Sequence, residues 1–350
     1  MLARLDPRRL WRRGSAPAFA TAGGGCGCHA DQPGAGGLPG AVGGLPVATD
    51  VGIRLSASGP DDRIRGAVRE YYGERARGVP EGSGTDPSGV PSGGLLPAEV
   101  SAVPSYQAQD LAAVPANAIQ ASLGCGNPFD RAALQPGEVV LDLGSGGGMD
   151  ALVASQRVGP DGHVFGLDMS DDMLALAQRN ATAAGVTNVA FLKGDMESVP
   201  LPRGSVDVII SNCVVNLVPD KARALREAHR VLRPEGRLSI SDIVTRRPVP
   251  EHLKGDLSAW AACVGGALTE DEYRAELAAA GFVDIEITRD REFTAVDADL
   301  AGLTPVLARA GLSKALELGF ANTSVRARKP LPELVDDPPA VRVPAAALSD

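Results

Sequence analysis

An apolar strand pattern that runs directly into a glycine-rich loop most constrains what this chain can fold into. Residues 139–143 read VVLDL, and residues 144–148 read GSGGG. A helical pattern follows from Asp150. Glycine between a buried strand and a helix lets the backbone approach a ligand closely at the carboxyl edge of a sheet. The segment therefore predicts a strand–loop–helix unit that binds a ligand.

Strands and helices continue to alternate after this unit. The fourth strand pattern is apolar almost throughout, as in a strand that is buried on both faces of a sheet. Strands that alternate with helices of this length predict an α/β fold with a doubly wound, mostly parallel sheet. We expect strands at 139–143, 163–168, 189–193, 206–211 and 237–243, and helices at 150–158, 170–184 and 219–232.

The flanking regions predict a less regular structure. Residues 78–98 are rich in glycine, proline and serine and have the composition of a flexible linker. Residues 1–60 show no sustained period and cannot bury enough apolar surface to fold. We also expect helices from Asp61 and at 253–260 and 270–280, a loop at 261–268, and two closing strands at 285–288 and 324–327.

Composition limits the partners and the compartment. The formal net charge is −9, and the absence of a long basic stripe argues against a nucleic-acid partner. No apolar run approaches the roughly 18 residues that a membrane helix needs. Residues 1–22 are basic like the first part of a targeting signal, but the apolar stretch within them is short and is broken by Pro17. Five cysteines are few for a secreted disulfide scaffold. We therefore expect a cytoplasmic protein.

Two cofactors fit a glycine loop of this kind. A dinucleotide fold needs the pattern G-x-G-x-x-G/A. Counted from Gly144, the last position is Met149, which does not match. Counted from Gly146, it is Ala151, which matches but lies well past the strand end. The dinucleotide pattern is therefore weak, and a glycine turn that serves only helix–sheet packing stays open as a further alternative.

An S-adenosylmethionine site fits the residues better. Such a site has an acid just before the glycines, an acid at the end of the next strand for the ribose diol, and a Gly-Asp pair after the third strand. This combination resembles the class I S-adenosylmethionine-dependent methyltransferases. The candidate residues for the cofactor are Asp142, Gly144, Gly146, Asp168, Met169, Asp195, Met196 and Asn212.

Three cysteines fall in loops beside the predicted sheet. Cys213 follows the fourth strand, Cys125 lies in a GCGNP segment before the sheet, and Cys263 lies in a CVGG segment after it. Because ligands of an open parallel sheet bind outside the carboxyl ends of its strands, Cys213 is expected to face the site of methyl transfer. The alternative is that each cysteine is a small buried hydrophobe.

Three thiolates suit a soft ion. Zinc normally takes a fourth ligand, and no histidine is closely spaced with these cysteines. Trivalent arsenic binds three sulfurs in a pyramid and keeps a lone pair. That lone pair can attack a sulfonium methyl group without a general base.

Four segments resemble the shorter, bacterial form of the arsenite methyltransferase family. They read GCGNP, VLDLGSGGGMD, SNCVVNLVPDKARALREAHRVL and CVGGAL. The resemblance implies a Rossmann-like sheet of seven strands with added substrate-binding segments at both ends. It also implies that Cys125, Cys213 and Cys263 bind the substrate arsenic, and that an external thiol such as thioredoxin or glutathione is the reductant.

The resemblance also divides the chain into segments. The expected domains are a disordered extension (1–60), a helical and loop segment (61–128), an S-adenosylmethionine-binding domain (129–248), a metalloid-binding segment with closing strands (249–330) and a flexible tail (331–350). Family members often carry a further cysteine where residues 82–85 read GSGT. Cys26 and Cys28 could replace it in a disulfide relay, or could be bystanders. Two other functions stay open: methylation of an organic small molecule, with structural cysteines, and metalloid sequestration without turnover.

Overall fold

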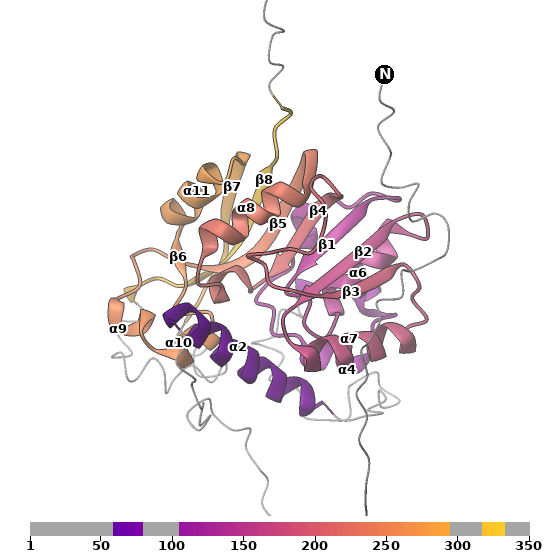
Figure 1. The fold of residues 1–350 in the computed structure, drawn as a ribbon, viewed down its shortest axis with the longest axis horizontal. Helices are drawn as coiled ribbons and strands as arrows, with labels where there is room; N and C mark the ends of the chain where they lie inside the picture. Colours follow the sequence, from indigo (N-terminus) through magenta and orange to yellow (C-terminus); the bar gives the residue numbers. More distant parts are fainter. Residues whose placement is uncertain (1–58, 80–104, 295–316, 333–350) are drawn as a thin grey trace, which may run out of the picture. The chain divides into compact units, whose positions relative to one another are not determined.

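The computed structural model describes residues 59–79, 105–294 and 317–332 (Figure 1). Contacts divide the chain into two units, residues 1–50 and 51–350, and every described residue belongs to the second. The expected disordered extension up to residue 58, Cys26 and Cys28, most of the expected linker, and the tail from residue 333 lie outside the described residues.

A mixed sheet with a parallel centre forms the core (Figure 1). Its strand order is β3-β2-β1-β4-β5-β8-β7, and β6 pairs with the end of β5. Strand β1 pairs in parallel with both β2 and β4, so the prediction of a doubly wound, mostly parallel sheet is confirmed. The five parallel strands of the main path are β1 (Val139–Leu143), β2 (His163–Asp168), β3 (Val189–Lys193), β4 (Val206–Asn212) and β5 (Leu232–Thr245).

Two antiparallel strands complete the sheet. Strand β8 (Ala321–Arg328) lies between β5 and β7 (Val283–Glu292), and it pairs with both in antiparallel register. The last strand in the sequence is therefore not at the sheet edge. The two predicted closing strands are confirmed, and both are longer than predicted because each pairs along most of its length.

Helices cover both faces of the sheet. Leu141 and Ile209 face one side and pack with helices α8 and α11, whereas Val140 and Val208 face the other and pack with α6, as the alternation of side chains along a strand requires. The helices that flank the sheet are α6 (Met149–Val158), α7 (Asp171–Ala183), α8 (Lys221–Val231) and α11 (Glu270–Ala279).

Local capping fixes where these helices begin and end. The Ser170 hydroxyl accepts a hydrogen bond from the Met173 amide and caps α7. Thr269 and Glu272 form a capping box at the start of α11. Gly281 follows that helix at φ +96°, in the left-handed region that glycine adopts without strain.

One predicted helix is two helices in the structure. Residues 253–260 were expected to form a single helix, but α9 (Glu251–Lys254) and α10 (Leu257–Ala261) are separated by Gly255 and Asp256. The Asp256 carboxylate accepts hydrogen bonds from the amides of Ser258 and Ala259. The pattern of apolar residues did not reveal this second N-cap, which starts a new helix.

Helix α2 (Pro60–Arg77) packs against α7 and α10 (Figure 1). Arg77 forms an ion pair with Asp172 at the start of α7, and Val68 is buried. No helix of residues 59–79, 105–294 and 317–332 is long and apolar enough to cross a membrane. The remaining short elements are α3 (Ala108–Leu111), α4 (Ala116–Ala121), α5 (Phe129–Ala132), the 3₁₀ turn η2 (Val215–Leu217) and β6 (Leu268–Thr269).

Candidate functional site

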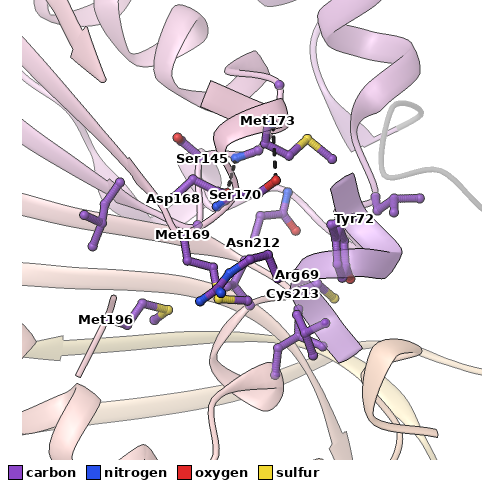
Figure 2. A pocket seen from close by; sticks show the side chains of 18 of the residues that line it. Arg69, Tyr72, Ser145, Asp168, Met169, Ser170, Met173, Met196, Asn212 and Cys213 are labelled. Carbon is purple, nitrogen blue, oxygen red and sulfur yellow. Dashed lines mark hydrogen bonds between the residues drawn. The ribbon is translucent and has the colours of Figure 1, made fainter. Parts of the chain in front are cut away.

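A pocket lies at the carboxyl ends of β1, β2 and β4, beneath helix α2 (Figure 2). It holds about 1040 Å³ of empty space, including the solvent at its mouth. All the cofactor candidates except Asp142 line this pocket: Gly144, Gly146, Asp168, Met169, Asp195, Met196 and Asn212.

The Asp168 side chain, at the end of β2, accepts hydrogen bonds from two backbone amides, one of them in the glycine loop. The Gly146 amide donates to Asp168 Oδ2 at 2.9 Å, and the Ser170 amide donates to Asp168 Oδ1 at 2.9 Å. A carboxylate has about four acceptor sites, so Asp168 keeps capacity for a ligand's hydroxyl groups. Gly144 adopts φ +73°, and a Cβ there would overlap the Val214 side chain. Only glycine fits at this point of the loop.

The carboxyl groups of Asp142, Asp150 and Asp168 lie close enough beneath the loop to interact electrostatically. Asp142 is 2% exposed, and its Oδ2 has no hydrogen-bond partner within the described part of the chain. Burial, followed by the charges of Asp150 and Asp168, raises the pKa of Asp142 well above its usual value. Burial also raises the pKa of Asp150 to about 6. In their ionised forms these carboxylates repel one another. A ligand with a positively charged group at this place would offset the repulsion.

Helix α2 closes one side of the pocket with residues that sequence reasoning missed. Arg65, Arg69 and Tyr72 line the pocket, and Figure 2 labels the last two. Arg65 Nε lies 3.0 Å from Glu197 Oε2 and 3.4 Å from Asp195 Oδ2. The three side chains share helical spacing with the buried Val68, but no local signal shows that Arg65 meets Asp195 and Glu197, about 130 residues away.

The three cysteines come together beside this pocket. Cys213 lines it, and all three belong to one apolar cluster with Val68 and Leu217. Cys125 and Cys213 form a disulfide with a Cα–Cα distance of 5.8 Å. Cys263 is a free thiol, and its Sγ donates a hydrogen bond to the Cys213 carbonyl oxygen at 3.2 Å. The sequence predicted three thiolates, whereas the structure holds two of these sulfurs in a disulfide bond.

Two of these cysteines have unusual backbone conformations. Cys213 has φ +59° and Cys263 has φ +60°. Residues other than glycine occupy this left-handed region in only a few per cent of cases, and such residues cluster at functional sites. In this oxidised state, no group of three or more His, Cys, Asp or Glu side chains among the described residues could hold a metal ion.

The glycines beside the cysteines are close-packing positions. A Cβ on Gly124 would overlap Asn212, and one on Gly126 would overlap Ser241. A Cβ on Gly266 would overlap the Asn216 backbone. The glycines therefore let the loops pack closely against β4, β5 and η2.

A buried polar cluster lies under the Cys263 loop. Asn216 Nδ2 donates to Asp242 Oδ1 at 2.8 Å and to the Ile243 carbonyl at 2.7 Å. Lys221 Nζ lies 4.6 Å from the centre of the Trp260 ring. Burial raises the pKa of Asp242 to about 7 and lowers that of Lys221 to about 8.

The sequence did not predict this buried polar cluster. Asn216 lies within the quoted SNCVVNL segment, but its sequence spacing carries no sign of a buried partner on β5.

Burial likewise raises the pKa of the Cys263 thiol to about 12, so this group is a neutral thiol in the structure described here.

The chain is similar to known methyltransferases. A methyltransferase-domain family model matches residues 134–281. An arsenite methyltransferase of Halobacterium salinarum is 43% identical over 244 residues, which are 67% of this chain and 62% of that protein. An arsenite methyltransferase of Aquipseudomonas alcaligenes is 41% identical over 185 residues, or 51% of this chain and 53% of that protein. The chain thus spans less than two thirds of these two curated relatives.

The match with one solved structure covers a larger share of the related chain. CrArsM, an arsenic (III) S-adenosylmethionine methyltransferase from Chlamydomonas reinhardtii, matches with 33% identity and a TM-score of 0.56. The match covers 65% of this chain and 75% of the algal one. The fold, the glycine loop at the strand ends and this similarity agree, and the chain belongs to the arsenite methyltransferase family.

Proposed function

We propose that this protein transfers methyl groups from S-adenosylmethionine to trivalent arsenic held by the thiolates of Cys125, Cys213 and Cys263. One observation carries the proposal: Cys213 lines the pocket and contacts both other cysteines, one through a disulfide and one through a hydrogen bond. Three sulfur ligands suit trivalent arsenic, which is soft and takes three bonds.

The pocket residues have fitting roles toward the cofactor. Asp168 would hold the ribose hydroxyl groups with the acceptor sites that Gly146 and Ser170 leave unused. The buried Oδ2 of Asp142 would lie toward the cationic end of the cofactor. Met169 and Met196 offer apolar contacts. When bound, S-adenosylmethionine would supply a methyl group carried on positively charged sulfur. The arsenic lone pair would attack the carbon of that methyl group, and the carbon–sulfur bond would break to leave S-adenosylhomocysteine.

The thiols can bind arsenic without a separate base. Each thiol forms an arsenic–sulfur bond while its proton leaves with one hydroxyl group of arsenous acid as water. The raised pKa of Cys263 is therefore no obstacle to binding. The sulfurs of Cys125 and Cys213 must first be reduced, so a thiol reductant such as thioredoxin or glutathione belongs to the proposal. Free thiols suit the reducing cytoplasm.

A methylation assay with product speciation tests the proposal. The purified full chain would receive arsenite, S-adenosylmethionine and a thiol reductant. We expect methylated arsenicals and S-adenosylhomocysteine in matching amounts, and neither from Cys213→Ser. Two outcomes would overturn the proposal: methylation of an organic acceptor but not of arsenite, or tight binding of arsenite without turnover.

A further inference from the structure

We propose that Asn212 is a positioning residue that clamps the Cys125 loop against the end of β4, and that it is not a ligand of the cofactor. Its importance for arsenic chemistry rests on the proposed function, because Cys125 would be one of three arsenic ligands. The residue lines the pocket (Figure 2), and its place after a strand end had suggested a contact with the cofactor.

The hydrogen bonds of the Asn212 side chain are all directed at the protein. Its Oδ1 accepts from the Cys125 amide at 3.1 Å and from the Gly126 amide at 3.3 Å. Its Nδ2 donates to the Gly126 carbonyl at 2.9 Å and lies 3.0 Å from Tyr106 Oη and 3.2 Å from Asp150 Oδ2. An asparagine amide has two acceptor lone pairs and two donor protons, and these five contacts occupy them all.

The packing supports the same conclusion. The three atoms nearest to a Cβ placed on Gly124 all belong to the Asn212 side chain. On the other side of the cysteine, Gly126 leaves no space for a Cβ beside Ser241 of β5. The loop backbone thus packs closely against the end of β4 and against Ser241 of β5, and the Asn212 amide bonds it there.

Asn212 immediately precedes Cys213 in the sequence. Two adjacent residues at the end of β4 therefore act on the same pair of sulfurs. Cys213 supplies one sulfur, and Asn212 holds the backbone of Cys125, which carries the other. Because the clamp acts on the Cys125 backbone rather than on its sulfur, it does not depend on the disulfide. Holding two groups in place raises their effective concentration toward each other and toward a shared ligand.

The equilibrium between the reduced cysteine pair and its disulfide measures this effect without arsenic or turnover. In a buffer of reduced and oxidised glutathione, the two thiols are oxidised to the disulfide while oxidised glutathione is reduced to two thiols. Thiol trapping and peptide mass spectrometry then quantify the Cys125–Cys213 bond in the full chain. Asn212→Ala should lower the equilibrium constant at least about tenfold, or about 1.4 kcal/mol.

A cofactor measurement and a matched control accompany this test. Calorimetry with S-adenosylmethionine should show an affinity for Asn212→Ala within about twofold of the wild type, since no ligand bond is lost. Asn188→Ala is the control variant, because Asn188 also donates two side-chain hydrogen bonds to backbone carbonyls, those of Ser155 and Gly159, away from the pocket. It should change neither constant.

A second route to the same site guards against a variant that fails to fold. In Gly124→Ala the added methyl group must displace the Asn212 side chain, so this variant should show a similar loss in the disulfide equilibrium. The double variant Asn212→Ala/Gly124→Ala should lose no more than Asn212→Ala alone, because the overlapping group is gone and the two effects are not additive.

Three outcomes would overturn the proposal: a normal disulfide equilibrium in folded Asn212→Ala or Gly124→Ala, additive losses in the double variant, or a tenfold loss of cofactor affinity with the disulfide equilibrium unchanged. The last outcome would make Asn212 a cofactor ligand. A wild-type chain that does not methylate arsenite would overturn the proposed function alone, because the disulfide equilibrium needs no arsenic.

Discussion

The Cys263 thiol donates a hydrogen bond to the carbonyl oxygen of Cys213 at 3.2 Å, so the free thiol contacts the backbone of the cysteine that lines the pocket. A serine hydroxyl at position 263 can donate to the same carbonyl, whereas it cannot replace sulfur as a soft ligand. This contact separates the structural role of Cys263 from its proposed chemical role.

We therefore expect Cys263→Ser to fold with near wild-type stability and to lose affinity for arsenite at least about tenfold. Urea unfolding and arsenite titration of the reduced protein measure the two properties. Cys263→Ala is the matched variant: it lacks both the sulfur and the donor, and it should lose stability as well as affinity. Wild-type arsenite affinity in Cys263→Ser would remove this residue from the ligand set.

Counting the bonds of arsenic predicts different effects for the other two cysteines. Arsenite offers three positions to sulfur, whereas methylarsenite offers two because carbon occupies the third. Cys125 is the least buried of the three cysteines, and Cys213 lies beside the cofactor pocket. Cys125→Ser should methylate methylarsenite but not arsenite, and Cys213→Ser should methylate neither. Product speciation from each substrate checks this, and normal arsenite turnover by either variant would contradict it.

The buried carboxyl group of Asp142 predicts a pH dependence of stability. Its folded pKa is raised, so the folded chain holds this proton more tightly than the unfolded chain. Its contribution to stability is therefore present at low pH and is lost as the pH rises from about 4 through the folded pKa. In Asp142→Asn, urea unfolding should show a weaker fall in stability between pH 5 and 8 and a higher stability at pH 8.

The same variant should bind S-adenosylmethionine more weakly, because an amide cannot give up a proton and so cannot gain the negative charge that a nearby cationic ligand favours. Asp161→Asn, at an exposed position, is the control and should behave like the wild type in both measurements. If Asp142→Asn falls in stability with pH as steeply as the wild type, the raised pKa does not belong to this residue.

Removing the Asp168 carboxylate is expected to weaken cofactor binding and also to loosen the glycine loop, because this carboxylate accepts hydrogen bonds from the Gly146 and Ser170 amides. Asp168→Ala should cost about 1.5–3 kcal/mol of affinity for S-adenosylmethionine, the range for hydrogen bonds to a charged group. Calorimetry on the purified protein measures it. Asp171→Ala removes a nearby carboxylate that is 77% exposed and should leave the affinity unchanged. Equal affinities in the two variants would show that Asp168 does not bind the ribose.

The ion pair of Arg65 predicts that helix α2 contributes to stability and to cofactor binding. Its guanidinium group forms an ion pair with Glu197, whose side chain is 4% exposed. Arg65→Ala leaves this carboxylate buried without its cation, which should cost about 1–3 kcal/mol of stability and also weaken cofactor binding. Arg63→Ala, at an exposed position of the same helix, is the control. Unfolding midpoints and calorimetry compare the two variants, and equal values would contradict the role of this ion pair.

Several elements could be predicted residue by residue from the sequence. The bounds of β1, β2 and β3 agree with the structure, because apolar runs bounded by turn and capping residues are a local signal. The length of β5 was underestimated, since Leu232 at its start pairs with Val206 of β4, and Val244 and Thr245 at its end pair with β6. Pairing between distant segments leaves no local periodicity to detect.

The sequence by itself determined the strand–glycine loop–helix unit, the alternating α/β pattern and the three cysteines as candidates for one site. These depend on the spacing of apolar residues and on side-chain chemistry, which are read locally. Only the tertiary structure decided that β8 lies between β5 and β7, that Arg65 meets Glu197, and that Asn212 bonds the Cys125 loop. Such contacts join residues that lie far apart in the sequence, and they exist only because packing of the sheet brings its strands and loops together.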